Sequence, residues 1–228
     1  MDKIYVKQAT DLLSTHSFLE NLDVFLSPFG FAFRKVKFRH AIHLYEKAIN
    51  VLISEHLNTD SVAEYYMEIG YIYSILGEPL KSAENYLKSA ENFLDTNRAF
   101  ISISFAMDIY FSLKKDHLTN QIYVKIVECY KLLSDLHYKL GEYAECAKYL
   151  DKCIHELNRY DFSNKRVEFY EKLAFIYLIH LERQAIALTI CEEIVRIDKT
   201  ENRNKYLKIC EYLRKDDLAS SRQLALGK

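Results

Sequence analysis

The stretch VAEYYMEIGYIYSILGEPLKSAENYLKSA, residues 62–90, decides the fold. Its apolar and small residues recur three and four positions apart, over residues 62–73 and again over residues 83–90. That spacing places one apolar stripe along an α-helix. Gly77 and Pro79 stand between the two runs, where they favour the end of one helix and the start of another. The stretch therefore predicts two helices joined by a tight turn.

The same helical spacing recurs along most of the chain. One helix and its turn repeat about every 21 residues, and a hairpin of two helices about every 42. This period is typical of an α-solenoid, in which each hairpin buries its apolar face only by stacking on its neighbours. The eight runs start at Ala41, Val62, Ala83, Ala99, Ile126, Cys146, Val167 and Ala187.

Two of the hairpins resemble tetratricopeptide-like (TPR-like) units. Such units have a Gly between the helices, a small residue where the second helix approaches the first, and an aromatic residue four positions later. The first hairpin supplies Gly77, Ser82 and Tyr86, and the second supplies Gly141, Cys146 and Leu150. We predict an all-α protein, an α-solenoid of eight or nine antiparallel helices arranged as TPR-like hairpins.

Composition agrees with this class. The 228 residues include five Gly and two Pro, half are hydrophobic, and 18 Tyr and 13 Phe supply packing volume. These values disfavour turn-rich β folds and wholesale disorder. A net charge of −1 leaves no field of one sign to attract nucleic acid. The five cysteines lack a C-x-x-C pair and are predicted to be reduced core residues of a cytoplasmic protein: Cys129, Cys146, Cys153, Cys191 and Cys210.

Motifs of common enzymes do not occur in the sequence. There is no glycine-rich dinucleotide loop, phosphate-binding P-loop, nucleophile elbow or H-E-x-x-H zinc motif. His40 and His43 are one helical turn apart, but no partner at ligand spacing completes a metal site, so we interpret them as a solvent-facing pair. We predict a non-catalytic protein with no cofactor, no metal and no small-molecule substrate.

One apolar segment does not fit the solenoid. Residues 25–33 read FLSPFGFAF, and Pro28 and Gly30 in it predict a loop. It could fold back over the first hairpin and bury its aromatic rings. It could instead touch a membrane, with the apolar side chains in the headgroup region and the basic ones near anionic lipid. The side chains concerned are Phe25, Leu26, Phe29, Phe31 and Phe33, followed by Arg34, Lys35 and Lys37.

These patterns divide the chain into two expected parts. Residues 1–40 are predicted to hold an N-terminal helix and the aromatic and basic loop, and residues 41–228 the helical solenoid. The opening Met1-Asp2-Lys3-Ile4 is unlike a signal peptide, and the longest uncharged run is too short to span a membrane.

The order of these features resembles the soluble NSF attachment protein (SNAP) family. A short helix and an aromatic loop precede AIHLYEKA at residues 41–48, and SAENY, AMDIY and NRNKYLK follow at residues 82–86, 106–110 and 202–208. The chain is identified as a divergent member. It ends at Lys228 and is shorter at its C-terminus than the family pattern.

The resemblance implies an adaptor that lies along a SNARE helical bundle and presents it to an AAA ATPase. It also favours peripheral membrane contact through the aromatic loop, in a cytoplasmic protein. Lys125 and Lys165-Arg166 are one hairpin period apart, which predicts one shared basic edge for an acidic partner. Two alternatives stay open. One is that these basic residues are ordinary solvated charges. The other is that the whole chain is a generic scaffold that binds a peptide motif of another protein.

Overall fold

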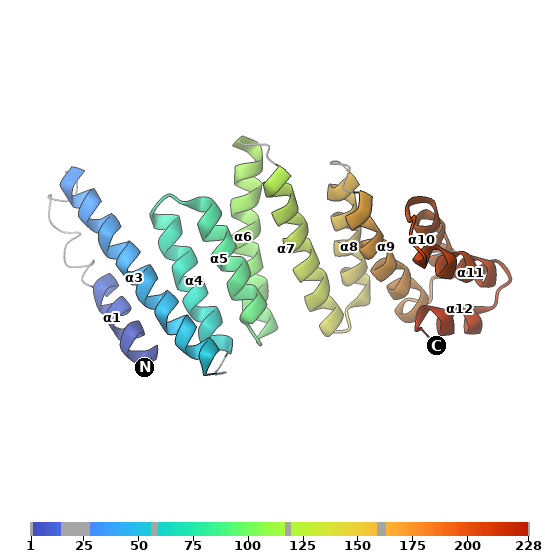
Figure 1. Cartoon of the computed structure of the whole chain (residues 1–228), viewed down its shortest axis with the longest axis horizontal. Helices are drawn as coiled ribbons and strands as arrows, with labels where there is room; N and C mark the ends of the chain where they lie inside the picture. The colour runs from blue at the N-terminus through green and yellow to red at the C-terminus, as the bar shows by residue number, and fades with distance from the viewer. Residues whose placement is uncertain (1, 15–27, 56–58, 117–119, 159–162, 228) are drawn as a thin grey trace. The chain divides into compact units, whose positions relative to one another are not determined.

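The structure is a computed structural model that describes residues 2–14, 28–55, 59–116, 120–158 and 163–227. Side chains are not described for residues 14, 28–34, 115–116 and 163–165. Within these limits the chain forms eleven α-helices and one π-helical turn, with no strand (Figure 1). The prediction of an all-α solenoid of helical hairpins is confirmed.

The chain divides into two compact units, residues 1–116 and 117–228. In each unit the helices pack in chain order, each on the next. The first unit holds α1 (Asp2–Ser14), α3 (Pro28–Ser54), α4 (Thr59–Ile75), α5 (Pro79–Asn92) and α6 (Thr96–Asp116). The second holds α7 (Asn120–Lys139), α8 (Tyr143–Asn158), α9 (Ser163–Phe175), the π turn η2 (Ile176–His180), α10 (Gln184–Ile197), α11 (Asn202–Arg214) and α12 (Leu218–Ala225).

The hairpin of α4 and α5 shows why small residues recur. Ser82 Oγ donates a hydrogen bond of 2.7 Å to the carbonyl of Gly70 across the two helices. A Cβ atom on Gly70 would lie 3.1 Å from Tyr86 Cδ1 and 3.2 Å from the carbonyl oxygen of Ser82. These backbones approach so closely that a larger residue at position 70 would force them apart.

Turns within the hairpins depend on residues with positive φ. Gly77 and Gly141 have φ values of 70° and 75°. The amide after each glycine donates to a carbonyl five residues back, from Glu78 to Tyr73 and from Glu142 to His137. This is the helix-ending hydrogen bond that a left-handed glycine permits, and it confirms both glycines as helix stops.

The N-terminal prediction needs correction from Pro28 onward. Residues 28–33 open α3 rather than forming a loop, and the boundary expected at residue 40 lies inside that helix. Pro is compatible with the first turn of a helix because its missing amide has no intrahelical partner there. Gly30 in a helix costs only about 1 kcal/mol relative to Ala. Phe25 and Leu26 lie outside the described residues.

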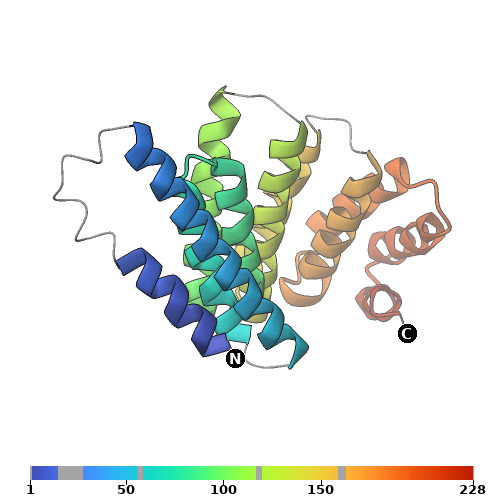
Figure 2. The same ribbon diagram turned by 60° about the vertical axis from the view of Figure 1, so that its left-hand side comes forward.

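The predicted number of helices was also too small. Beyond the eight repeated runs and the N-terminal helix, the chain forms α11 and α12. Figure 2 shows α1 lying along α3 at the N-terminal end, as the hairpin contacts require. No helix in the described part of the chain is long and apolar enough to cross a membrane.

All five cysteines are buried free thiols. Burial raises the pKa of Cys129 and of Cys153 to about 12, because a thiolate would lose its hydration. The structure therefore places these side chains in the core, as predicted. At neutral pH these two are protonated and act as small apolar residues.

Candidate functional site

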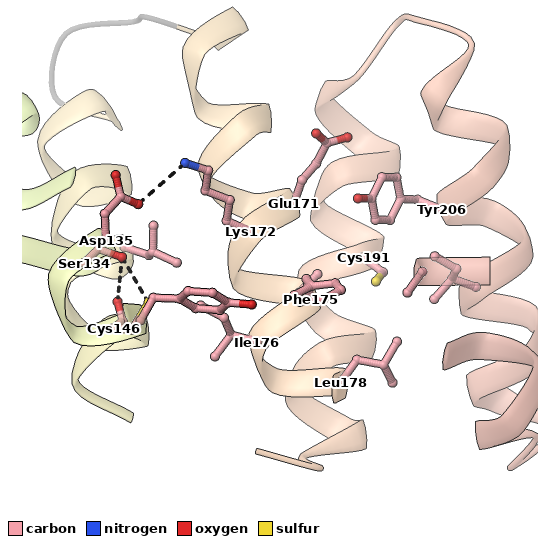
Figure 3. A pocket seen from close by; sticks show the side chains of 15 residues that line it. Ser134, Asp135, Cys146, Glu171, Lys172, Phe175, Ile176, Leu178, Cys191 and Tyr206 are labelled. Atoms are coloured by element: carbon pink, nitrogen blue, oxygen red, sulfur yellow. Dashed lines mark hydrogen bonds and ion pairs between the residues drawn. The ribbon is translucent and has the colours of Figure 1, made fainter. Parts of the chain in front are cut away.

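A cavity of about 400 Å³ lies within the unit of residues 117–228 (Figure 3). Side chains from α7 through α12 line it, and most of this lining is apolar. Its apolar wall includes Leu150, Ala174, Ile176, Leu178 and Ile209. Its rim includes the half-buried side chains of Asp135, Glu171 and Lys172, and the buried Tyr206 lies on the same wall as Glu171. An apolar pocket with a few polar groups at its edge is the usual form of a binding site.

The π turn η2 shapes one wall of this cavity. It continues α9, and its residues Ile176 and Leu178 both line the cavity. The amide of Leu181 donates to the carbonyl of Ile176 at 3.0 Å, a span of five residues. A π turn accommodates one extra residue in a helix and occurs often at functional sites.

The last helix, α12, is attached to the π turn through Arg222. Its Nε donates to the carbonyl of Leu178 at 3.1 Å, and its guanidinium lies 2.9 Å from a carboxylate oxygen of Glu182. The last carbonyls of a helix have no intrahelical partner, so this contact satisfies one of them. Ala225 of α12 lines the cavity. Arg222 therefore holds one cavity wall in place.

An aromatic cluster lies beside the cavity around His180. The imidazole stacks on Tyr143 with 3.7 Å between ring centroids, and Phe175 meets it edge-on at 5.6 Å. The hydroxyl of Tyr138, a cavity residue, lies 3.3 Å from His180 Nε2. Burial lowers the pKa of His180, because the charged imidazolium loses hydration. These contacts fix the end of η2 against the turn of the preceding hairpin.

The rim of the cavity carries opposed charges. Lys172 Nζ lies 3.9 Å from Asp135 Oδ1 and 3.5 Å from Glu168 Oε1. Glu171 Oε1 accepts a hydrogen bond of 2.9 Å from the side-chain amide, Nδ2, of Asn202. Its pKa is raised, first by burial and then by the neighbouring carboxylate of Asp198. The Glu171 side of the rim is therefore richer in negative charge than the Lys172 side.

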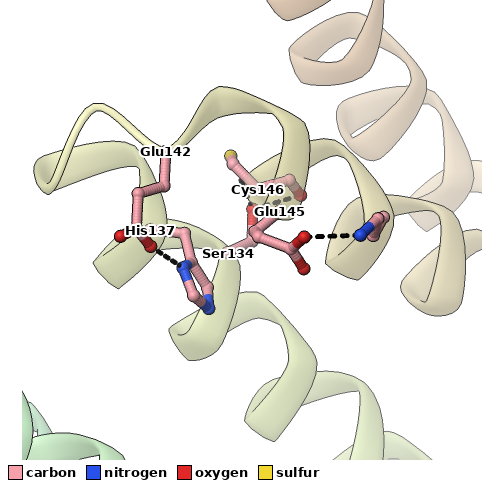
Figure 4. A network of polar contacts seen from close by, with 6 residues as sticks. Ser134, His137, Glu142, Glu145 and Cys146 are labelled. Carbon is pink, nitrogen blue, oxygen red and sulfur yellow. Dashed lines mark hydrogen bonds and ion pairs between the residues drawn. The ribbon is translucent and has the colours of Figure 1, made fainter.

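A polar network joins α7 to α8 next to the cavity (Figure 4). Ser134 Oγ lies 3.1 Å from Cys146 Sγ and 3.3 Å from the carbonyl oxygen of Cys146. At the turn, His137 Nδ1 lies 2.6 Å from Glu142 Oε2. Ser134 and Cys146 also line the cavity. The close approach of two helices and the cavity wall thus use the same small side chains.

A second hollow, of about 430 Å³, lies in the first unit between α3, α4 and α5. Its lining is mainly polar and mixes acids such as Glu46 with bases such as Lys88. Lys88 lies over the ring of Tyr66, 5.5 Å from its centroid. Because this hollow offers neither an apolar anchor site nor one sign of charge, the cavity of the second unit is the stronger candidate.

In the second unit, two of the basic residues singled out from sequence have partners close by in the chain. Lys125 Nζ lies 2.8 Å from Glu128 on its own helix, and Arg166 donates to Asn158 Oδ1 at 2.6 Å. The helices α7 and α9, which carry Lys125 and Lys165-Arg166, begin at the same end of the unit (Figure 1). The side chain of Lys165 is not described.

The N-terminal candidates lie on α3. Lys35 and Lys37 are half-buried, and the side chains of Phe29, Phe31, Phe33 and Arg34 are outside the described set. His43 lies 4.0 Å from Glu46 and is exposed, as its interpretation as a solvent-facing residue requires. Among the described residues, no group of three or more His, Cys, Asp or Glu side chains could hold a metal ion.

Sequence reasoning missed the cavity, although a signal for it is present. In three hairpins the first helix carries a small residue with a Tyr four positions before it. The small residues are Gly70, Ser134 and Ala174. The matching small residue on the second helix is Ser82, Cys146 or Ala187. The separation is 12 residues in the first two hairpins and 13 in the third. That extra residue coincides with the π turn.

Comparisons with known proteins find likeness in fold only. No protein-family model and no curated protein matches the chain. Among solved structures, BtubC (BKLC) from P. vanneervenii is 14% identical, with a TM-score of 0.49, over 100% of this chain and 87% of that one. A putative kinesin light chain of Podospora anserina with TPR-like repeats is 13% identical, with a TM-score of 0.42, over 96% and 95%. MamA is 20% identical, with a TM-score of 0.34, over 89% and 94%.

Proposed function

We propose that this chain is a non-catalytic adaptor that binds another protein, and that the cavity between α7 and α12 receives an apolar side chain of that partner. The observation that carries this proposal is the cavity itself, which is apolar inside and polar at its rim. Protein interfaces concentrate their binding energy in such places, where an anchor fills a pocket and polar groups surround it.

Display selection of peptides on the intact chain tests this proposal. Selected peptides are measured by calorimetry against the wild type and against Ala225→Trp, which fills the cavity from α12. Ala219→Trp places the same side chain at an exposed position of that helix and serves as the matched control. We expect Ala225→Trp to weaken binding at least tenfold and Ala219→Trp to leave it unchanged, since loss of a buried anchor contact commonly costs about 2 kcal/mol.

Equal binding to the wild type and Ala225→Trp would overturn the proposal. Ala225→Trp could also displace α12, so Cys191→Leu is included as a second way to narrow the cavity, from α10. Circular dichroism and urea denaturation establish that each variant is folded before its affinity is compared.

The sequence resemblance to the SNAP family gives the proposal a finer form. In that form the partner is a SNARE bundle, an AAA ATPase receives the complex, and residues 25–33 attach the chain to anionic membrane. Because α3 begins at Pro28, the attachment element would be the first turns of a helix and the residues before it. The shared starting end of α7 and α9 supports placing Lys125 and Lys165 on one edge.

Liposome flotation with and without a SNARE bundle tests this finer form. We expect flotation with anionic vesicles, loss of flotation on replacing Phe29 and Phe31 with Ser, and recruitment of the bundle. Reversal of Lys125 and Lys165 to Glu should reduce bundle binding strongly at low salt and less at high salt. Bundle binding that survives the reversal at low salt excludes this edge, and failure to recruit the bundle excludes the SNARE partner.

A further inference from the structure

The charges around the cavity indicate what kind of anchor it accepts. Resting on the proposed function, we propose that the anchor is a large apolar residue with a Lys or Arg beside it, so that the apolar part fills the cavity while the cation faces Glu171. The partner is thus a protein segment that pairs apolar surface with positive charge at one point.

The positive charge on the rim is already balanced by nearby carboxylates. Lys172 contributes one cation, and it lies within 4.0 Å of both Asp135 and Glu168. Glu168 is in turn 3.8 Å from Lys131. Two bases and two acids therefore balance on this side of the rim, and it offers no excess charge to an incoming anion.

Glu171 lies in a different environment. Its hydrogen-bond partners are neutral: the side-chain amide of Asn202 at 2.9 Å and the hydroxyl of Tyr206. Asp198, a second carboxylate, raises its pKa in addition to burial. Lys205 is the one base among the groups acting on it, and its Nζ lies 3.5 Å from the carbonyl oxygen of Ala225. The other acids that act on Glu171, Asp198 and Glu168, thus outnumber this one base.

An added cation would improve this arrangement, and an added anion would worsen it. The carboxylate of Glu171 is half-buried on the rim, where water screens a charge less than at the surface. Glu171 projects from α9 near Tyr206 of α11 in Figure 3, on the opposite side of the α9 ribbon from Asp135. The cationic group would therefore lie between α9 and α11.

Three small probes of similar shape test the charge preference: phenethylamine, phenethyl alcohol and hydrocinnamate. Each carries a phenyl ring of a size that the cavity admits, and they differ in charge. Ligand-observed NMR on the full chain measures each dissociation constant. We expect phenethylamine to bind about fivefold tighter than the alcohol, as one partly exposed ion pair allows, and hydrocinnamate to bind most weakly.

Variants assign the preference to Glu171. Glu171→Gln should remove the difference between the amine and the alcohol while leaving binding of the alcohol intact. Glu201→Gln, at an exposed position just before α11, should leave all three constants unchanged. Ala225→Trp and Cys191→Leu should each weaken all three probes, which locates the binding in the cavity.

Several results would overturn this inference. They are equal binding of the amine and the alcohol, tighter binding of hydrocinnamate, no binding of any probe, or a preference that survives Glu171→Gln. Peptides selected through the cavity that carry no Lys or Arg beside their anchor would overturn it too, while leaving the adaptor proposal in place. Peptides that ignore the cavity would instead overturn the adaptor proposal.

Discussion

The hairpin of α4 and α5 and the hairpin of α9 and α10 are built on the same pattern with one residue of difference. In the first, Gly70 and Ser82 are 12 residues apart, and the turn between them uses Gly77 with a φ of 70°. In the second, Ala174 and Ala187 are 13 residues apart, and the positive φ of 53° falls on Glu182. The extra residue is taken up by the π turn that precedes this turn.

The comparison shows how an insertion can create a site in a repeat. In the shorter hairpin the amide of Glu78 reaches back five residues to Tyr73, whereas in the longer one the amide of Arg183 reaches back six residues to Tyr177. The π turn places Ile176 and Leu178 in the cavity wall and leaves the carbonyl of Leu178 to Arg222. The cavity thus lies where the repeat is irregular.

The largest expected effect on stability comes from a substitution in the regular hairpin of α4 and α5. Gly70→Leu should lower the free energy of unfolding by about 3 kcal/mol, because even its Cβ would lie 3.1 Å from the ring of Tyr86. Urea denaturation measures the change. Gly141→Ala is the control with a positive φ but open space around it, and it should cost only about 1 kcal/mol. Equal losses in both variants would show that close packing at Gly70 is unimportant.

The second prediction concerns the contact that the longer hairpin makes with α12. Arg222→Met keeps much of the side-chain length but removes the hydrogen bond to Leu178 and the ion pair with Glu182. The free energy of unfolding should fall by about 2 kcal/mol, since hydrogen bonds of charged groups contribute about 1.5 to 3 kcal/mol. Hydrogen exchange should show faster opening of α12 than of α11. Unchanged exchange in α12 would refute the assigned role of Arg222.

The general fold was predictable because it depends on many residues at once. The period of about 21 residues appears in eight runs, and Gly77 and Gly141 mark turns with a residue that tolerates positive φ. One irregular helix does not obscure a period that eight runs share. The N-terminal segment failed for the opposite reason, because Pro28 and Gly30 suggested a loop, while Pro at the first helical position is compatible with a helix.

The cavity leaves a single trace in the same pattern, the 13-residue separation of Ala174 and Ala187. It depends on one added residue near η2, and on Arg222 reaching a backbone carbonyl 44 residues earlier. A turn whose positive φ falls on Glu182 rather than on Gly gives no compositional signal. Contacts between distant residues of this kind are set by packing, not by local preference.

A smaller effect sharpens the comparison at the turns. Glu182→Gly gives the longer hairpin the residue that the shorter one uses at positive φ. Relief of the left-handed conformation should stabilise the chain by about 1 kcal/mol, and loss of the exposed pair with Arg222 should offset less than half of that. Thermal unfolding measures the net gain. Asp216→Gly, at a φ of 61°, should act in the same direction, and a destabilised Glu182→Gly would show that its contact with Arg222 outweighs the backbone strain.

The smallest expected effect compares Glu171 with its counterpart. Glu171 is three residues before Ala174, and Met67 holds the same place before Gly70, so one hairpin carries a half-buried acid where the other carries an apolar residue.

Burial and Asp198 raise the pKa of Glu171 in the folded chain. Between its ordinary pKa and this raised value, the folded state binds more protons than the unfolded state, so stability falls as pH rises through that window.

Glu171→Gln removes this loss while keeping an oxygen that accepts from Asn202. The variant and the wild type should therefore be equally stable at acidic pH, and above the raised pKa the variant should be more stable by about 0.5 kcal/mol, a small value because water screens the partly exposed rim. Urea denaturation of both proteins across this pH range measures the difference. A variant that loses stability relative to the wild type as pH rises would mean that the charged form of Glu171 is favoured by its surroundings, and would remove the excess negative charge on which cation binding depends.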